Sequence, residues 1–127
     1  MLVSIALGLA FLRIGVLHFT NPAAFDAIVP EYLGWPRFWT LWSGGLEIML
    51  GIGLALPWTR AISARILFVL VILMSLANIN MWINDIPFDG IRLSNTGHIF
   101  RMLAQVVLLV ILAWLGRFSK KGHTNDR

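Results

Sequence analysis

The sequence contains no cysteine, and this absence excludes a class of chemistry for the chain itself. Disulfides, thiolate metal sites, iron–sulfur clusters and CxxC redox motifs all need cysteine sulfur. Any redox role must therefore use electrons carried by another molecule.

Charge is also scarce. Charged residues make up 13% of the 127 residues, against 58% hydrophobic residues, and the mean hydropathy is +0.80. A water-soluble domain with this balance would expose large apolar patches and aggregate. A membrane-spanning helix needs roughly 20 apolar residues, so four spans would use about 80 and leave only short connections. We therefore expect one integral membrane domain of the all-α class.

The formal net charge of +4 does not indicate a nucleic-acid partner. The basic residues lie mainly beside hydrophobic segments, where such residues set membrane topology. We expect the lipid bilayer, and no nucleic acid, as the surrounding partner.

The hydrophobic runs predict a four-helix bundle. The first run lacks the basic start and the small-residue cleavage pattern of a signal peptide, so we expect it to be retained. We predict a single transmembrane domain over residues 1–116 and a basic cytoplasmic tail over residues 117–127. The four predicted spans cover residues 1–19, 39–56, 61–83 and 97–115.

The first connection carries signals for a short interfacial helix. Asn21 can cap a helix that has Pro22 at its first position, and Pro30 ends it. Apolar residues on one side of residues 22–29 suit a helix that lies on the membrane. Tryptophans near the span ends predict an aromatic belt rather than a stacking site. They are Trp35, Trp39, Trp42, Trp58 and Trp82.

The basic residues divide unequally between the two sides of the predicted bundle. The positive-inside rule therefore places both termini in the cytoplasm and the two longer connections outside. Arg60, Arg65, Arg117, Lys120, Lys121 and Arg127 lie on one side, and Arg37 and Arg92 lie on the other.

Three ionisable residues, Arg13, Glu47 and Arg101, lie inside predicted spans. At about 2.5–3.5 kcal/mol for each charge near the bilayer centre, three unpaired charges would cost roughly 7–10 kcal/mol. We therefore expect Glu47 to pair with one of the two arginines.

Helical spacing gathers these residues into one polar layer. Gly44, Glu47 and Gly51 share a face of small residues, where membrane helices meet. Counting 1.5 Å per residue places the polar residues of all four helices about 6–12 Å below the outer surface. This outward-facing layer is the predicted ligand site, with no metal and no assigned catalytic residue. Its candidate ligand-binding residues are Arg13, His18, Glu47, Asn78, His98, Arg101 and Gln105.

A structural interpretation of the same residues stays open. Arg13 and Arg101 could extend to the outer interface while Glu47 only locks the helices together. His18 and His98 could form interfacial hydrogen bonds. A bis-histidine haem site is a further alternative.

Several short segments match a known pattern. They are Gly15-Val-Leu-His18-Phe19, Pro22-x-x-Phe25 with Ile28-Val29-Pro30 and Tyr32-Leu33, Ser43-Gly44-Gly45-Leu46-Glu47-Ile48 with Gly51, Asn78-Ile79-Asn80-Met81, and Arg101 with Gln105. In this order and spacing the chain resembles the DoxX-like family of small four-helix bacterial membrane proteins, over residues 13–106. The last motif usually reads Arg-Leu-Pro-Leu-Gln, and Leu103 stands here in place of the proline, so a kink is not implied.

The resemblance implies a redox function in the bacterial cytoplasmic membrane. Some members are similar to membrane subunits that pass electrons from sulfur compounds to quinone, and others accompany thiol-redox proteins. The implied function is a redox accessory or quinone-reactive subunit that binds a small anion, a quinone or a lipid. A quinone is the implied non-covalent cofactor, and a redox protein or a second copy is the implied partner. The alternative is a non-catalytic scaffold or lipid-binding bundle, so whether the protein is an enzyme stays open.

Overall fold

The computed structural model describes residues 2–88 and 90–124, with side chains described as far as residue 116. Within these residues the chain is helical and forms no strand. The elements are α1 (Leu2–Thr20), α2 (Pro22–Asp26), the 3-10 turn η1 (Glu31–Leu33), α3 (Pro36–Ala55), α4 (Arg60–Ile83) and α5 (Asn95–Thr124). The helices α1, α3, α4 and the Asn95–Gly116 part of α5 are long and apolar enough to cross a membrane. The predicted all-α membrane bundle is confirmed.

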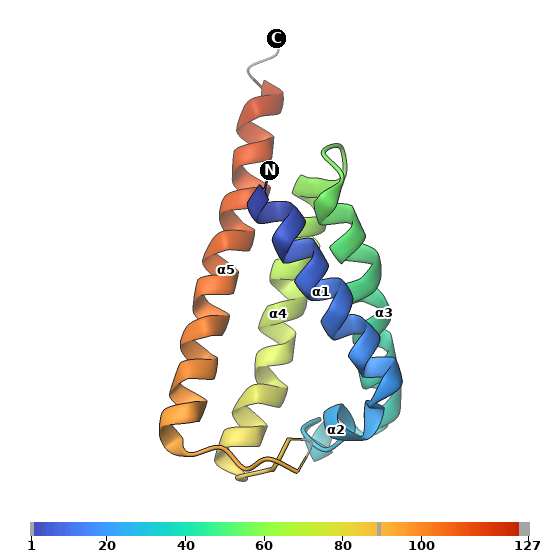
Figure 1. Ribbon diagram of the computed structural model, residues 1–127, viewed down its shortest axis with the longest axis vertical. Helices are drawn as coiled ribbons and strands as arrows, with labels where there is room; N and C mark the ends of the chain where they lie inside the picture. Colours follow the sequence, from blue (N-terminus) through green and yellow to red (C-terminus); the bar gives the residue numbers. More distant parts are fainter. Residues whose placement is uncertain (1, 89, 125–127) are drawn as a thin grey trace.

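The four long helices alternate in direction (Figure 1). The start of α1 and the end of α5 lie at one end of the bundle, together with the short turn between α3 and α4. The two longer connections, which carry α2, η1 and residues 84–94, lie at the other end. We call this the α2 end.

The helix boundaries follow local sequence signals. Pro36 at the first turn starts α3 three residues before its predicted start, because proline is favoured at that position. Ser94 and Thr96 are both residue types that cap a helix here, and Ser94 accepts a hydrogen bond from the Gly97 amide at 3.2 Å and so caps α5. The predicted tail at residues 117–127 begins as a continuation of α5, which extends to Thr124. Residues 125–127 of that tail lie outside the described residues.

α1 and α3 pack closely through glycines. A Cβ atom added to Gly51 would lie 2.7 Å from the Gly8 carbonyl oxygen, and one added to Gly15 would lie 2.7 Å from the Gly44 carbonyl oxygen. Only the absence of side chains allows the two backbones to approach this far. The predicted small-residue stripe on α3 is therefore a helix contact, and α1 supplies its partner glycines.

The apolar core fills the half of the bundle away from the α2 end. It joins the later half of α3, the first half of α4 and the last part of α5. Its buried members are Phe11, Leu50, Leu54, Ala64, Leu67, Leu70, Val71, Leu112 and Leu115. The α1/α3 pair and the α4/α5 pair separate towards the α2 end (Figure 1).

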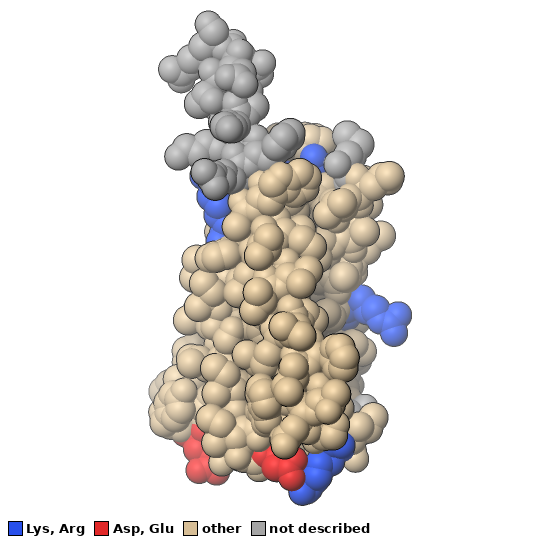
Figure 2. All heavy atoms as spheres, turned by 90° about the vertical axis from the view of Figure 1, so that its left-hand side faces the viewer, with Lys and Arg blue, Asp and Glu red and all other residues tan. Residues whose placement is uncertain are grey.

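Charged side chains gather at the ends of the molecule. Most of the face shown in Figure 2 is tan, its acidic side chains lie at the α2 end, and one basic side chain projects from the right-hand edge about halfway along. A middle region with few charges between charged ends is what a hydrocarbon core requires.

Candidate functional site

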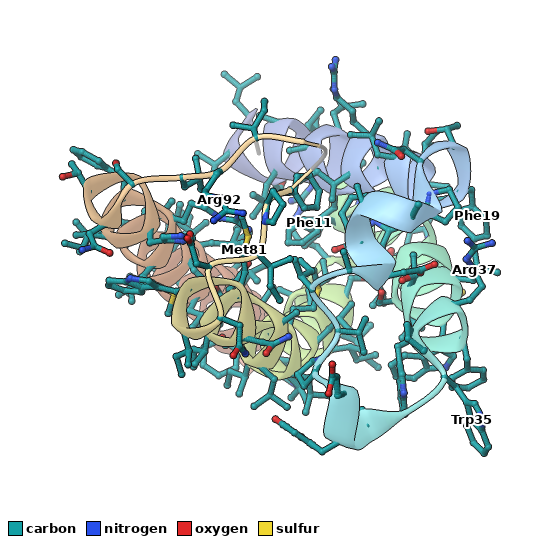
Figure 3. The ribbon with its side chains drawn as sticks, turned by 90° about the horizontal axis from the view of Figure 1, so that it is seen from below. Phe11, Phe19, Trp35, Arg37, Met81 and Arg92 are labelled. Atoms are coloured by element: carbon teal, nitrogen blue, oxygen red, sulfur yellow. The ribbon has the colours of Figure 1, made fainter. Side chains whose placement is uncertain are left out.

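A cavity of about 420 Å³ lies between the two helix pairs at the α2 end. All four long helices contribute to its wall, and α2 and the 84–94 connection cover it (Figure 3). Most of the wall is apolar. Its polar side chains include His18, Thr40, Ser43, Asn78 and Arg101.

A chain of hydrogen bonds joins α4 to α5 beside this cavity. Arg101 Nη2 donates to Asn78 Oδ1 at 2.6 Å, and Asn78 Nδ2 donates to Gln105 Oε1 at 2.6 Å. Gln105 Nε2 then donates to the Val71 carbonyl at 2.9 Å and also contacts Ser75 Oγ. The structure therefore brings together three of the predicted site residues, Asn78, Arg101 and Gln105.

Arg101 contacts a sulfur atom and an aromatic ring rather than a carboxylate of the described residues. Its Nη1 donates to Met81 Sδ at 2.7 Å, and its Cζ lies 5.9 Å from the Phe88 ring centroid. Among the residues whose side chains are described, no carboxylate lies within ion-pair distance of it. A guanidinium has five N–H donors, so donors remain for a bound molecule. The cavity wall thus carries a cation that has no counter-charge among the described side chains.

The predicted pairing of Glu47 with an arginine is wrong. Glu47 is 1% exposed, and its Oε2 lies 3.4 Å from His18 Nδ1. That nitrogen also lies 2.7 Å from the Ile14 carbonyl oxygen, which is the nearer acceptor for its single proton. Within the described part of the chain, Glu47 Oε2 therefore has no hydrogen-bond partner. His18 lines the cavity, whereas Glu47 lies outside its wall.

Arg13 does not belong to the inward-facing layer. Phe11, Gly15 and His18 are buried on one face of α1, whereas Arg13 is exposed. Two residues along a helix turn a side chain by about 200°, so Arg13 must face the opposite side. Its depth suggested a shared layer, but depth does not determine the face. The arginine fits the structural alternative, in which its stem extends along the lipid towards the interface.

His98 also lies apart from the cavity wall. It is buried, and its ring stacks on Trp82 with centroids 5.6 Å apart and an interplanar angle of 11°. His18 instead stacks on Phe25, with centroids 3.7 Å apart. The two histidines thus lie in separate aromatic contacts.

Within the described residues, no cluster of three or more histidine, aspartate and glutamate side chains could hold a metal ion.

The predicted interfacial helix serves as a cover of the cavity. Asp26 accepts hydrogen bonds from Arg37 Nε at 2.8 Å and from Thr40 Oγ1 at 2.6 Å, which fasten α2 to α3. Phe25 meets Phe88 edge-on at 5.0 Å, so the two outer connections touch each other. The predicted helix over residues 22–29 is shorter than expected, since it ends at Asp26 and residues 27–29 form a turn and a bend.

Trp39 was predicted to belong to the aromatic belt and was not among the predicted site residues. Trp39 lines the cavity, and its indole Nε1 is buried without a hydrogen-bond partner among the described residues. Ser43 and Glu47 follow it at i+4 and i+8, a helical spacing that could have assigned Trp39 to the inward face. Its aromatic type instead favoured the membrane interface.

Comparisons with known proteins give a family but no activity. No curated protein and no solved structure matches the chain. A family model described as "Domain of unknown function (DUF8561)" matches residues 7–117, a range that includes the entire described cavity wall. The chain therefore belongs to the DUF8561 family, a domain of unknown function.

Proposed function

We propose that the protein binds a small amphiphile with an oxygen-bearing head, a quinone or an anionic molecule, in the cavity at the α2 end. The protein then serves as a membrane redox accessory or quinone-reactive subunit. The observation that carries the proposal is the position of Arg101. Its guanidinium lines an apolar cavity and has no carboxylate partner among the described residues.

The size and the lining of the cavity suit such a ligand. Small-molecule sites measure about 300–1,000 Å³ and combine apolar walls with a few placed polar groups. The volume of about 420 Å³ falls within this range. Phe25, Trp39 and Phe88 offer aromatic surface to a planar ring. Quinones and single-tailed amphiphiles therefore fit better than bulky, strongly hydrated solutes.

The charge at the wall favours an acceptor-rich head. An unpaired charge in the membrane interior costs several kcal/mol, and an oxygen ligand would relieve part of that cost. The planar donors of Arg101 match a quinone carbonyl or a small oxyanion, and Asn78 holds the guanidinium in place at 2.6 Å. A bound quinone would supply the electron-carrying chemistry that a chain without cysteine lacks.

The redox role and the cellular placement rest on the resemblance to the DoxX-like family. That resemblance supports a bacterial cytoplasmic membrane location. The division of basic residues supports an orientation with both termini cytoplasmic and the α2 end outside. A redox protein or a second copy of the chain would be the partner.

A scaffold or lipid-binding function is the second candidate, because one observation favours it. The hydrogen bonds from Arg101 through Asn78 to Gln105 already clamp α4 to α5. Arg101 could therefore have a purely structural role in holding α4 against α5, without binding a ligand. The two candidates differ in whether the cavity binds a small molecule specifically.

Titration with a short-tailed quinone in detergent distinguishes them. Trp39 lines the cavity, so a quinone bound there should quench tryptophan fluorescence with saturation. Ala77→Phe places a large ring at the cavity wall and should abolish the saturable quenching. Ala104→Phe, on the exposed face of α5, is the matched control and should bind like the parent. Non-saturable quenching that is equal in all three proteins would reject the binding function.

A further inference from the structure

The cavity reaches the molecular surface on the side that faces lipid. Five of the described lining residues are exposed, and three of them lie on α3 and α4. These three are Trp42, Leu73 and Leu76, with exposed fractions of 45%, 50% and 39%. Three exposed side chains that line one cavity from two neighbouring helices indicate an opening between these helices.

The arrangement of α3 and α4 explains why an opening lies there. A short turn joins the two helices at the end opposite α2, where Gly53 leaves room for the Ser63 side chain. From this contact the helices diverge towards the α2 end (Figure 1). The cavity occupies the space that this divergence creates.

Access from water at the α2 end is restricted by the cover. Phe25 contacts Phe88 across the two outer connections, and Asn80 Nδ2 donates to the Ile28 carbonyl at 3.0 Å. These contacts tie α2 and the residues after it to α4 and to the 84–94 connection. The remaining exposed lining residues are Ile14 on α1 and Leu33 in η1.

We infer that the ligand enters the cavity sideways from the hydrocarbon of the membrane, through a portal between α3 and α4 formed by Trp42, Leu73 and Leu76. This inference rests on the proposed binding function and narrows its substrate class. The ligand is a lipid-phase amphiphile with a hydrocarbon tail, rather than a water-soluble anion.

The chemistry of the portal supports this class. None of its three side chains carries a charge, so a hydrated anion would have to shed its water before reaching Arg101. A lipid-phase molecule pays no such penalty. With its head at Arg101 and Asn78, its tail would extend between Trp42 and Leu73 into the surrounding lipid.

The test compares rates of uptake by the protein in vesicles. A long-tailed quinone is mixed with the protein in a stopped-flow instrument, and the quenching of tryptophan fluorescence is followed over time. The quenching signal of each variant is divided by its own final amplitude, so that rates can be compared between variants with different numbers of tryptophans. The double variant Leu73→Trp, Leu76→Trp narrows the portal and should slow uptake roughly tenfold, equivalent to about 1.4 kcal/mol in the barrier. Ile72→Trp, on the neighbouring lipid-facing position outside the cavity, should leave the rate unchanged.

A tailless quinone provides the equilibrium measurement. Its saturable binding should survive in the double variant, which shows that the variant is folded and that its cavity is intact. Leu76→Phe is a milder variant for use if the double variant fails to fold.

Other outcomes contradict the inference in distinguishable ways. If Ile14→Trp slows uptake and the double variant does not, access runs past the exposed Ile14 on α1 instead. If all variants take up quinone at the parent rate, the α3–α4 portal is wrong although the binding function stands. If the parent binds neither quinone, the proposed function itself fails.

Discussion

His18 Nδ1 on α1 lies 3.4 Å from Glu47 Oε2 on α3, and both side chains are buried between the two helices. Among the described residues, neither side chain lies within 4 Å of any other oppositely charged group. The pair therefore joins α1 to α3 by a polar contact inside an interface of glycines and apolar side chains.

This contact predicts that His18 and Glu47 are energetically coupled. The two side chains lie in contact at 3.4 Å, so their effects on stability should not be independent, and the double substitution should cost less than the sum of the single ones. A cycle of His18→Gln, Glu47→Gln and the double variant should give a coupling free energy of about 0.5–3 kcal/mol. Denaturant titration in detergent measures it. Additive effects would show that the two side chains do not interact.

The glycine contact between α1 and α3 gives a second prediction. A Cβ atom at Gly51 would lie 2.7 Å from the Gly8 carbonyl oxygen, a backbone atom that cannot turn aside. Gly51→Ala should therefore destabilise the bundle by about 1–3 kcal/mol, and Gly51→Leu by more. Thermal unfolding in detergent measures the loss.

Gly45 supplies the matched control on the same helix. A Cβ atom there would meet its nearest neighbour, Phe19 Cζ, at 4.0 Å. Gly45→Ala should leave the stability unchanged or slightly raise it, because alanine favours the helix more than glycine does. Equal losses in Gly45→Ala and Gly51→Ala would show that close packing is not what the glycine at position 51 provides.

The helices and the small-residue stripe could be predicted from the sequence because they depend on local patterns. Apolar runs of membrane-spanning length fix the four helices, and the spacing of Gly44 and Gly51 assigns one face of α3 to a neighbour. The partner glycines Gly8 and Gly15 carried the same signal, at i and i+7, but nothing in the sequence paired the two stripes.

The site could be predicted only in part, because its contacts depend on how the helices pair. Asn78, Arg101 and Gln105 meet as expected, since α4 and α5 are adjacent in the bundle. Glu47 faces His18 because α3 packs on α1, so the expected arginine partner was wrong.

Membrane orientation gives a third prediction. The absence of native cysteine allows single cysteines to be introduced without background labelling. Ala23 in α2 and Trp58 in the α3–α4 turn are exposed at opposite ends of the bundle. In intact cells, an impermeant maleimide should label Ala23→Cys and should label Trp58→Cys only after lysis. The reverse pattern would place the α2 end in the cytoplasm.

The binding role of Arg101 gives a fourth prediction. Glutamine at position 101 removes the charge and keeps an amide that can donate to Asn78, so the clamp between α4 and α5 should largely survive. Hydrogen bonds to charged groups contribute about 1.5–3 kcal/mol, so quinone affinity should fall roughly tenfold to a hundredfold. Arg92→Gln is the matched control, because Arg92 is also an arginine at the α2 end but is exposed, pairs with Asp85 and does not line the cavity. Its quinone affinity should equal that of the parent.

The most direct measurement is the equilibrium dissociation constant of one quinone for the parent, Arg101→Gln and Arg92→Gln, determined by calorimetry in the same detergent. A ligand site at Arg101 predicts weaker binding in Arg101→Gln alone, with the melting temperatures of the three ligand-free proteins close together. Equal dissociation constants in all three, or an Arg101→Gln variant that unfolds while the parent binds no quinone, would contradict it.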